Sequence, residues 1–123
     1  MNTAKRQTLF SRAVVDASNA FNARCSELRG MRQSLDLLDV DLPELEKRRI
    51  APQPGQITWL PNKGSLALHM ACKDDANLLY RELLVLGYAE CVRQDFVGGL
   101  SFVDLQKGSL RLNVAVHTDK DAA

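Results

Sequence analysis

Long apolar runs are missing from this sequence of 123 residues: none approaches the roughly eighteen residues of a membrane-spanning helix. The first residues also lack the basic-then-apolar plan of a secretory signal peptide. Neither charge is in excess, because sixteen lysines and arginines stand against fifteen aspartates and glutamates. We therefore expect a cytoplasmic protein that makes no membrane contact. Bulk electrostatics is not expected to be its main means of holding nucleic acid.

Sequence signatures of catalysis and cofactor binding are absent too. The chain has no Gly-rich phosphate loop, no nucleophile elbow, no EF-hand loop and no Cys/His cluster spaced for zinc. Cys25, Cys72 and Cys91 are odd in number and form no CxxC pair, so we expect reduced, buried thiols. The sequence thus predicts a non-catalytic protein without cofactor or metal.

What the sequence does contain is an apolar stripe of helical period. Apolar residues recur at steps of three and four from Val14 to Leu45, and Arg24 is the only polar residue among them. Gly30 costs roughly 1 kcal/mol inside a helix and marks the expected bend. We expect the chain to fold back there and cover a sheet; the alternative is a helix that projects and pairs with a second copy. The predicted self-association surface comprises Phe10, Val14, Phe21, Leu28, Met31, Leu35 and Leu38.

The remaining chain divides at a Pro/Gly linker over residues 51–56. Residues 1–50 form a helical segment of two or three helices, either a helical hairpin or a dimerisation helix. Beyond the linker the apolar period changes to two, which predicts a ββαβββ domain over residues 57–118 and a frayed tail over 119–123. This order indicates an α+β fold with a mainly antiparallel sheet and a helix on one face.

The expected elements of the second part have clear local signals. Strands are predicted over residues 57–60, 65–72, 88–97, 100–105 and 110–117 from their alternation and bounding turns. The helix between the second and third strands is expected to have Asp74 as its N-cap and to stop at Gly87. Trp59 is expected to anchor the first strand in the core.

Binding residues are predicted on the polar face of two strands. Alternation places His69 on one strand, and Arg111, Asn113 and His117 on another. If the strands are neighbours, these side chains could bind phosphate or exchange protons. Two histidines are too few for a metal site, and the alternative is a solvated sheet face.

A second set of candidates is the basic run Lys47, Arg48 and Arg49 at the end of a predicted helix. Cations suit a helix C-terminus, so the run either caps the helix or contacts phosphates. Phosphate contact would make the protein a nucleic-acid binder. The near-neutral charge and the 6% of aromatic residues disfavour that function.

Three segments, Leu83–Tyr88, Leu100–Phe102 and Gly108–Val114, resemble the helix-to-strands portion of small nucleotidyltransferase domains. The resemblance covers about a quarter of the chain. That family holds metal with paired carboxylates on its strands, whereas the matching strands here offer His69, Asn113 and His117. The resemblance therefore implies at most a degenerate, inactive relative.

Our leading hypothesis is a small binding or adaptor protein that self-associates through its N-terminal helices and recognises a protein partner. A phage or mobile-element accessory protein that binds a host factor fits this size and lack of motifs. The nucleic-acid binder and the degenerate nucleotidyltransferase-like domain are the alternatives.

Overall fold

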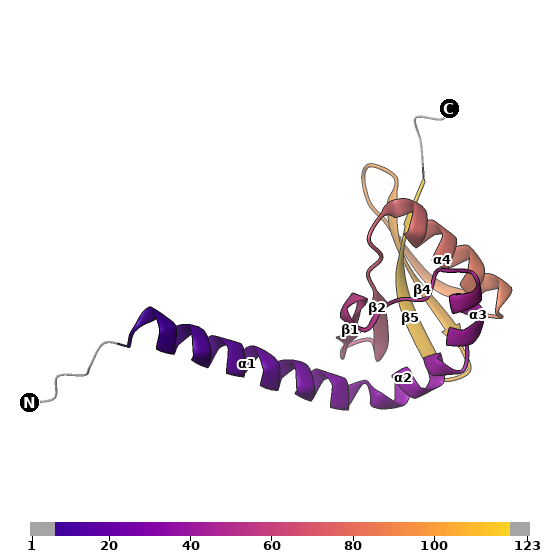
Figure 1. Ribbon diagram of the computed structural model, residues 1–123. Coiled ribbons are helices and arrows are strands. Elements are labelled where there is room, and N and C mark those ends of the chain that lie inside the picture. The colour runs from indigo at the N-terminus through magenta and orange to yellow at the C-terminus, as the bar shows by residue number, and fades with distance from the viewer. Residues whose placement is uncertain (1–6, 119–123) are drawn as a thin grey trace, which may run out of the picture.

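A long helix projects from a layered body in the computed structural model, which describes residues 7–118 (Figure 1). The body is a five-stranded sheet of order β1-β2-β5-β4-β3 with helices packed on one face. Only the β2–β5 pair is parallel. The predicted α+β class is confirmed. The elements are α1 (Leu9–Gly30), α2 (Arg32–Asp39), α3 (Leu42–Lys47), a 3-10 turn (Pro54–Gln56), β1 (Ile57–Leu60), β2 (Ser65–Leu68), α4 (Lys73–Val85), β3 (Ala89–Asp95), β4 (Leu100–Lys107) and β5 (Leu110–His117).

A single core joins the helices to the sheet. Alternation turns Leu112 and Val114 of β5 inward, where they meet Leu79 and Leu83 of α4. All four side chains are at most 1% exposed. Burying a leucine fully contributes about 1.5–3 kcal/mol relative to leaving it in water, so the contact between α4 and β5 contributes substantially to the stability.

Some predicted boundaries were wrong, and the reasons are local. Strand β2 ends at Leu68 rather than residue 72, because its partner β1 begins at Ile57 and is preceded by the 3-10 turn. The His69 amide extends the pairing by one bond, to the Gln56 carbonyl oxygen at 2.7 Å. Helix α4 has Cys72 rather than Asp74 as its N-cap residue. Asp74 instead lies in the first turn, where a carboxylate suits the helix dipole.

The expected fold-back at Gly30 is also wrong. A break does occur, since α1 ends at Gly30 and α2 begins at Arg32, but α1 extends away from the body (Figure 1). The last turns of α1 are held against β1, because Glu27 accepts a hydrogen bond from the Trp59 amide at 3.0 Å. Arg24 donates to the Pro54 carbonyl oxygen at 2.8 Å. These contacts direct α1 away from the sheet, which is covered by the other helices instead.

Candidate functional site

The apolar stripe of α1 lies in solvent. None of the 22 residues of this helix is buried. Phe10 is 78% exposed and Phe21 68%, and Val14 and Leu28 are exposed at positions that share their side of the helix. The Thr8 side chain caps the helix by accepting from the Ser11 amide at 3.1 Å. A capped helix therefore presents its apolar side to water over residues 9–23, before its last turns reach β1.

An isolated helix of this composition has little stability of its own. Helix nucleation is unfavourable, and helical stability in proteins comes mostly from packing an apolar face. The exposed half of α1 also contains β-branched Val14 and Val15 and the polar Asn19 and Asn22, which are weaker helix formers than alanine. The stripe is thus the surface of this molecule that most needs a partner.

Two residues predicted for the association surface are unavailable. Met31 and Leu38 are each 1% exposed, because α2 turns them into the core, so they are removed from that surface. Leu35 is partly buried against the same core. The rest of the predicted surface, Phe10, Val14, Phe21 and Leu28, remains exposed.

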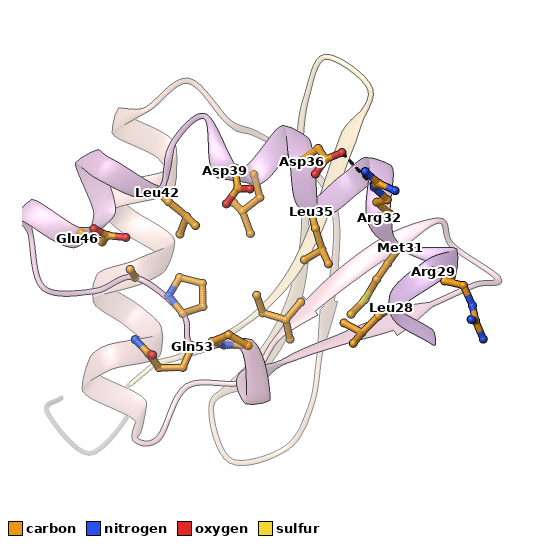
Figure 2. A pocket seen from close by; sticks show the side chains of 15 residues that line it. Leu28, Arg29, Met31, Arg32, Leu35, Asp36, Asp39, Leu42, Glu46 and Gln53 are labelled. Carbon is orange, nitrogen blue, oxygen red and sulfur yellow. Dashed lines mark ion pairs between the residues drawn. The ribbon is translucent and has the colours of Figure 1, made fainter. Parts of the chain in front are cut away.

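A groove continues the stripe where α1 meets the body. It has a volume of about 670 Å³ and lies between α2, α3 and the linker (Figure 2). Leu28, Leu35, Leu42 and Pro54 contribute to its apolar wall. Leu28 belongs to both the stripe and the groove, so the two form one continuous apolar surface.

Charged side chains are arranged unevenly along the groove rim. Arg29 and Arg32 lie at the end next to α1, whereas Asp36, Asp39 and Glu46 lie farther along (Figure 2). Asp36 and Arg32 form an exposed ion pair at 3.9 Å, too weak to neutralise the acidic stretch. The far part of the groove is therefore acidic.

The predicted polar constellation comes together in part. Because β2 and β5 are neighbours, His69, Asn113 and His117 line one pocket of about 300 Å³, together with Cys72 at the start of α4. Arg111 lies outside that pocket, and its guanidinium is 3.4 Å from the Gln106 side-chain oxygen. Three of the four predicted residues thus share a site.

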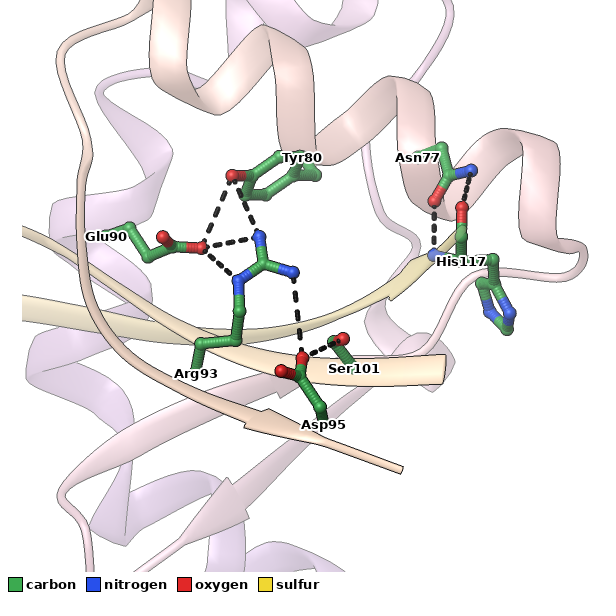
Figure 3. Close-up of polar contacts among 7 residues, drawn as sticks. All are labelled: Asn77, Tyr80, Glu90, Arg93, Asp95, Ser101 and His117. Atoms are coloured by element: carbon green, nitrogen blue, oxygen red, sulfur yellow. Dashed lines mark hydrogen bonds and ion pairs between the residues drawn. The ribbon is translucent and has the colours of Figure 1, made fainter. Parts of the chain in front are cut away.

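Two of the polar side chains in that pocket, His69 and Asn113, are hydrogen-bonded within the protein. His69 Nε2 is 2.8 Å from the Thr58 hydroxyl, and the Asn113 amide donates to Asp104 at 2.8 Å. Asn77 of α4 bonds both backbone groups of His117, which fixes the end of β5 while the imidazole points away from α4 (Figure 3). Among residues 7–118, no three His, Cys, Asp or Glu side chains gather closely enough to hold a metal ion.

The basic run at the end of α3 is not a free cationic surface. Arg48 forms an ion pair with Glu82 of α4, and Lys47 pairs with Glu44 at 3.2 Å. Arg49 has a positive φ of 59° where the chain turns into the linker. Two of the three predicted phosphate ligands therefore serve contacts within the protein.

The expectation of buried thiols is wrong for all three cysteines. Cys72 and Cys91 are exposed and Cys25 is half-buried, and all three are free. Cys91 lies at an irregularity in the pairing of β3, an edge strand that turns its side chains to water. The general preference of cysteine for the interior does not hold here, because these positions face no core.

Sequence reasoning missed a buried polar cluster under the α2–α3 turn. The Tyr88 hydroxyl donates to Asp41 at 2.7 Å, and the Lys107 ammonium lies 3.1 Å from the same carboxylate and 5.3 Å from the Tyr88 ring centroid. Burial, followed by the hydrogen bond to Asp41, raises the pKa of Tyr88 above its usual 10. The cluster joins the helical segment to the sheet. Its residues are too far apart in the sequence for a local signal.

A second network protects the exposed edge of the sheet. Arg93 of β3 donates to Glu90 at 2.8 Å and contacts the Tyr80 hydroxyl of α4, and its other side approaches Asp95 (Figure 3). Charged side chains and a bulge on an edge strand discourage pairing with another chain. The β3 edge is thus a poor candidate for association.

Across residues 7–118, no helix combines the length and apolar character needed to cross a membrane. Comparisons with protein-family models, with curated proteins and with solved structures found no match to this chain.

Proposed function

We propose that this protein is a non-catalytic binding protein that acts as a homodimer assembled through α1. The observation that carries the proposal is the exposed stripe of Phe10, Val14, Phe21 and Leu28 on a helix with no buried residue. A contiguous apolar surface of this kind marks an interaction site in a protein that must remain folded in water.

A second copy is the occupant that the stripe itself supports. Two identical stripes are self-complementary about a two-fold axis, the commonest symmetry of protein oligomers. Small residues such as Ala17 lie between the large Phe10 and Phe21, so knobs and holes alternate along one helix face. Packing this face also provides the stabilisation that an isolated helix lacks.

Dimerisation through α1 leaves the opposite end of the body free for a protein partner. Helix α1 leaves the body beside α2 (Figure 1). The pocket of His69, Asn113 and His117 includes the last residue of β5, His117. We assign recognition of the partner to this sheet face. The dimer would then present two copies of this sheet face, one from each chain.

The test of dimerisation is a pair of matched substitutions. Phe21→Asp places a charge in the middle of the stripe and is expected to raise the dimer dissociation constant by at least about 30-fold, because a hot-spot aromatic carries about 2 kcal/mol or more. Val97→Asp makes the same type of change on a fully exposed hairpin residue and leaves the dissociation constant unchanged. Both are measured by analytical ultracentrifugation. A wild-type protein that stays monomeric at tens of micromolar overturns the proposal.

A further inference from the structure

We infer that the two copies pair antiparallel, so that the start of each α1 occupies the groove of the other copy. The occupant is the first turn of the partner's helix, with Phe10 as the side chain that enters beside Leu28. This inference rests on the proposed dimer and deepens it, since it names the second surface that the dimer covers.

Helix geometry excludes the same contact within one chain. Phe10 and Leu28 lie on one continuous helix, eighteen residues apart. At 1.5 Å per residue they are separated by about 27 Å, so Phe10 cannot reach the groove beside its own Leu28. Only the Phe10 of another copy can occupy that position.

Antiparallel pairing also matches large residues to small ones. If Phe10 lies against the partner's Leu28, the two-fold axis passes near residue 19, and Ala17 faces the partner's Phe21. The same register is repeated on the other side of the axis. A parallel pair would instead set Phe21 beside Phe21 and leave both grooves open. The antiparallel register therefore alternates volumes as a close-packed interface requires.

The only polar residue on the stripe does not oppose this register. Arg24 faces the partner's Val14, but its guanidinium is directed to Glu27 and to the Pro54 carbonyl oxygen. The aliphatic part of the Arg24 side chain is therefore free to contact Val14 of the second copy. Pairing thus leaves the charge of Arg24 in contacts that it already has.

The stripe alone buries too little area for a stable dimer, which favours an interface that also includes the groove. A helix of 22 residues is about 33 Å long, and a contact strip about 10 Å wide covers roughly 330 Å². A stable interface buries about 800 Å² per partner. The groove of about 670 Å³ at each end extends the strip over α2 and the linker, which brings the contact closer to that size.

Photo-crosslinking of the full chain tests the inference. With p-benzoylphenylalanine in place of Phe10, irradiation is expected to give a covalent dimer whose linked peptides fall within residues 28–42 or 51–57. The same group in place of Val97, on the hairpin tip, is expected to give no covalent dimer. The linked residues are mapped by mass spectrometry after proteolysis.

The other outcomes separate this inference from the proposed function. Crosslinks from residue 10 to the partner's residues 9–21 mean a dimer in which the groove is empty, which overturns the inference alone. A protein that sediments as a dimer but gives no covalent dimer on irradiation also overturns the inference alone. A wild-type protein that sediments as a monomer at every concentration overturns the proposed function and the inference together.

Discussion

Helices α1 and α4 carry similar apolar periodicity but meet opposite environments. Helix α4 buries Ala76, Leu79 and Leu83 against β5, whereas α1 buries no residue at all. Periodicity therefore shows that one side of a helix is suited to burial, and it does not show which molecule does the burying. In α4 the sheet of the same chain does so, and for α1 we propose a second copy.

The largest expected effect on the free energy of unfolding concerns α4, the helix that packs against the sheet. Leu83→Ala removes a fully buried side chain from α4 and is expected to lower the free energy of unfolding by about 3 kcal/mol, from lost burial and the remaining cavity. Phe10→Ala, measured by urea unfolding at a concentration where the chain is monomeric, is expected to change it by less than about 0.5 kcal/mol. Equal losses in the two variants contradict the contrast between the helices.

The next effect concerns the junction of the helical segment with the sheet. Tyr88→Phe removes the hydrogen bond to the buried Asp41 and is expected to cost about 2 kcal/mol. Tyr80→Phe is the matched control, because its hydroxyl contacts Glu90 at 3.3 Å in an exposed setting, and it is expected to cost less than about 1 kcal/mol. Chemical denaturation at pH 7 compares the two.

The raised pKa of Tyr88 also predicts that the folded protein loses stability at alkaline pH. Its pKa is higher in the folded protein than the usual 10, so folding favours the neutral phenol. This contribution is complete below pH 10 and is lost as the pH rises from there towards the folded pKa. The unfolding free energy of Tyr88→Phe should fall less over the same range. An identical alkaline slope in both proteins argues against a role for this hydroxyl.

The smallest effect concerns the attachment of α1 to the body. The hydrogen bond from Arg24, and then that from the Trp59 amide, hold the pKa of Glu27 below its usual 4.5. Its contribution is therefore complete above pH 4.5 and lost as the pH falls below that value. Glu27→Gln is expected to cost about 1 kcal/mol at pH 7 and nothing near pH 2, whereas Glu44→Gln, which breaks an exposed pair with Lys47, costs less. Equal costs at both pH values contradict this role.

Local sequence patterns were sufficient for much of the body. Strand β5 over Leu110–His117 agrees with its prediction at both ends, because its alternation is regular and turns bound it. The Gly98–Gly99 turn is also present, and both glycines have the positive φ that such turns require. The antiparallel β1–β2 pair likewise follows from turn residues between two short apolar runs.

Features that depend on distant contacts were not accessible from the sequence. The direction of α1 is set by Glu27 and Arg24 reaching the backbone of residues 54 and 59, which no periodicity encodes. The same is true of the contact between Asp41 and Lys107, 66 positions apart. For the polar pocket, alternation placed Asn113 and His117 on the same face as Arg111. The register of β2 on β5 begins at Leu112, and the pocket lies toward the other end of β5, so Arg111 lies outside it.

Hydrogen exchange of the α1 backbone amides as a function of protein concentration tests the central claim most directly. We predict that residues 9–23 are protected at high concentration and lose protection on dilution into the monomer range, while β4 and β5 remain protected throughout. Protection of α1 that stays the same across the dilution series, in a protein that sediments as a monomer, would contradict the claim that a second copy completes this helix.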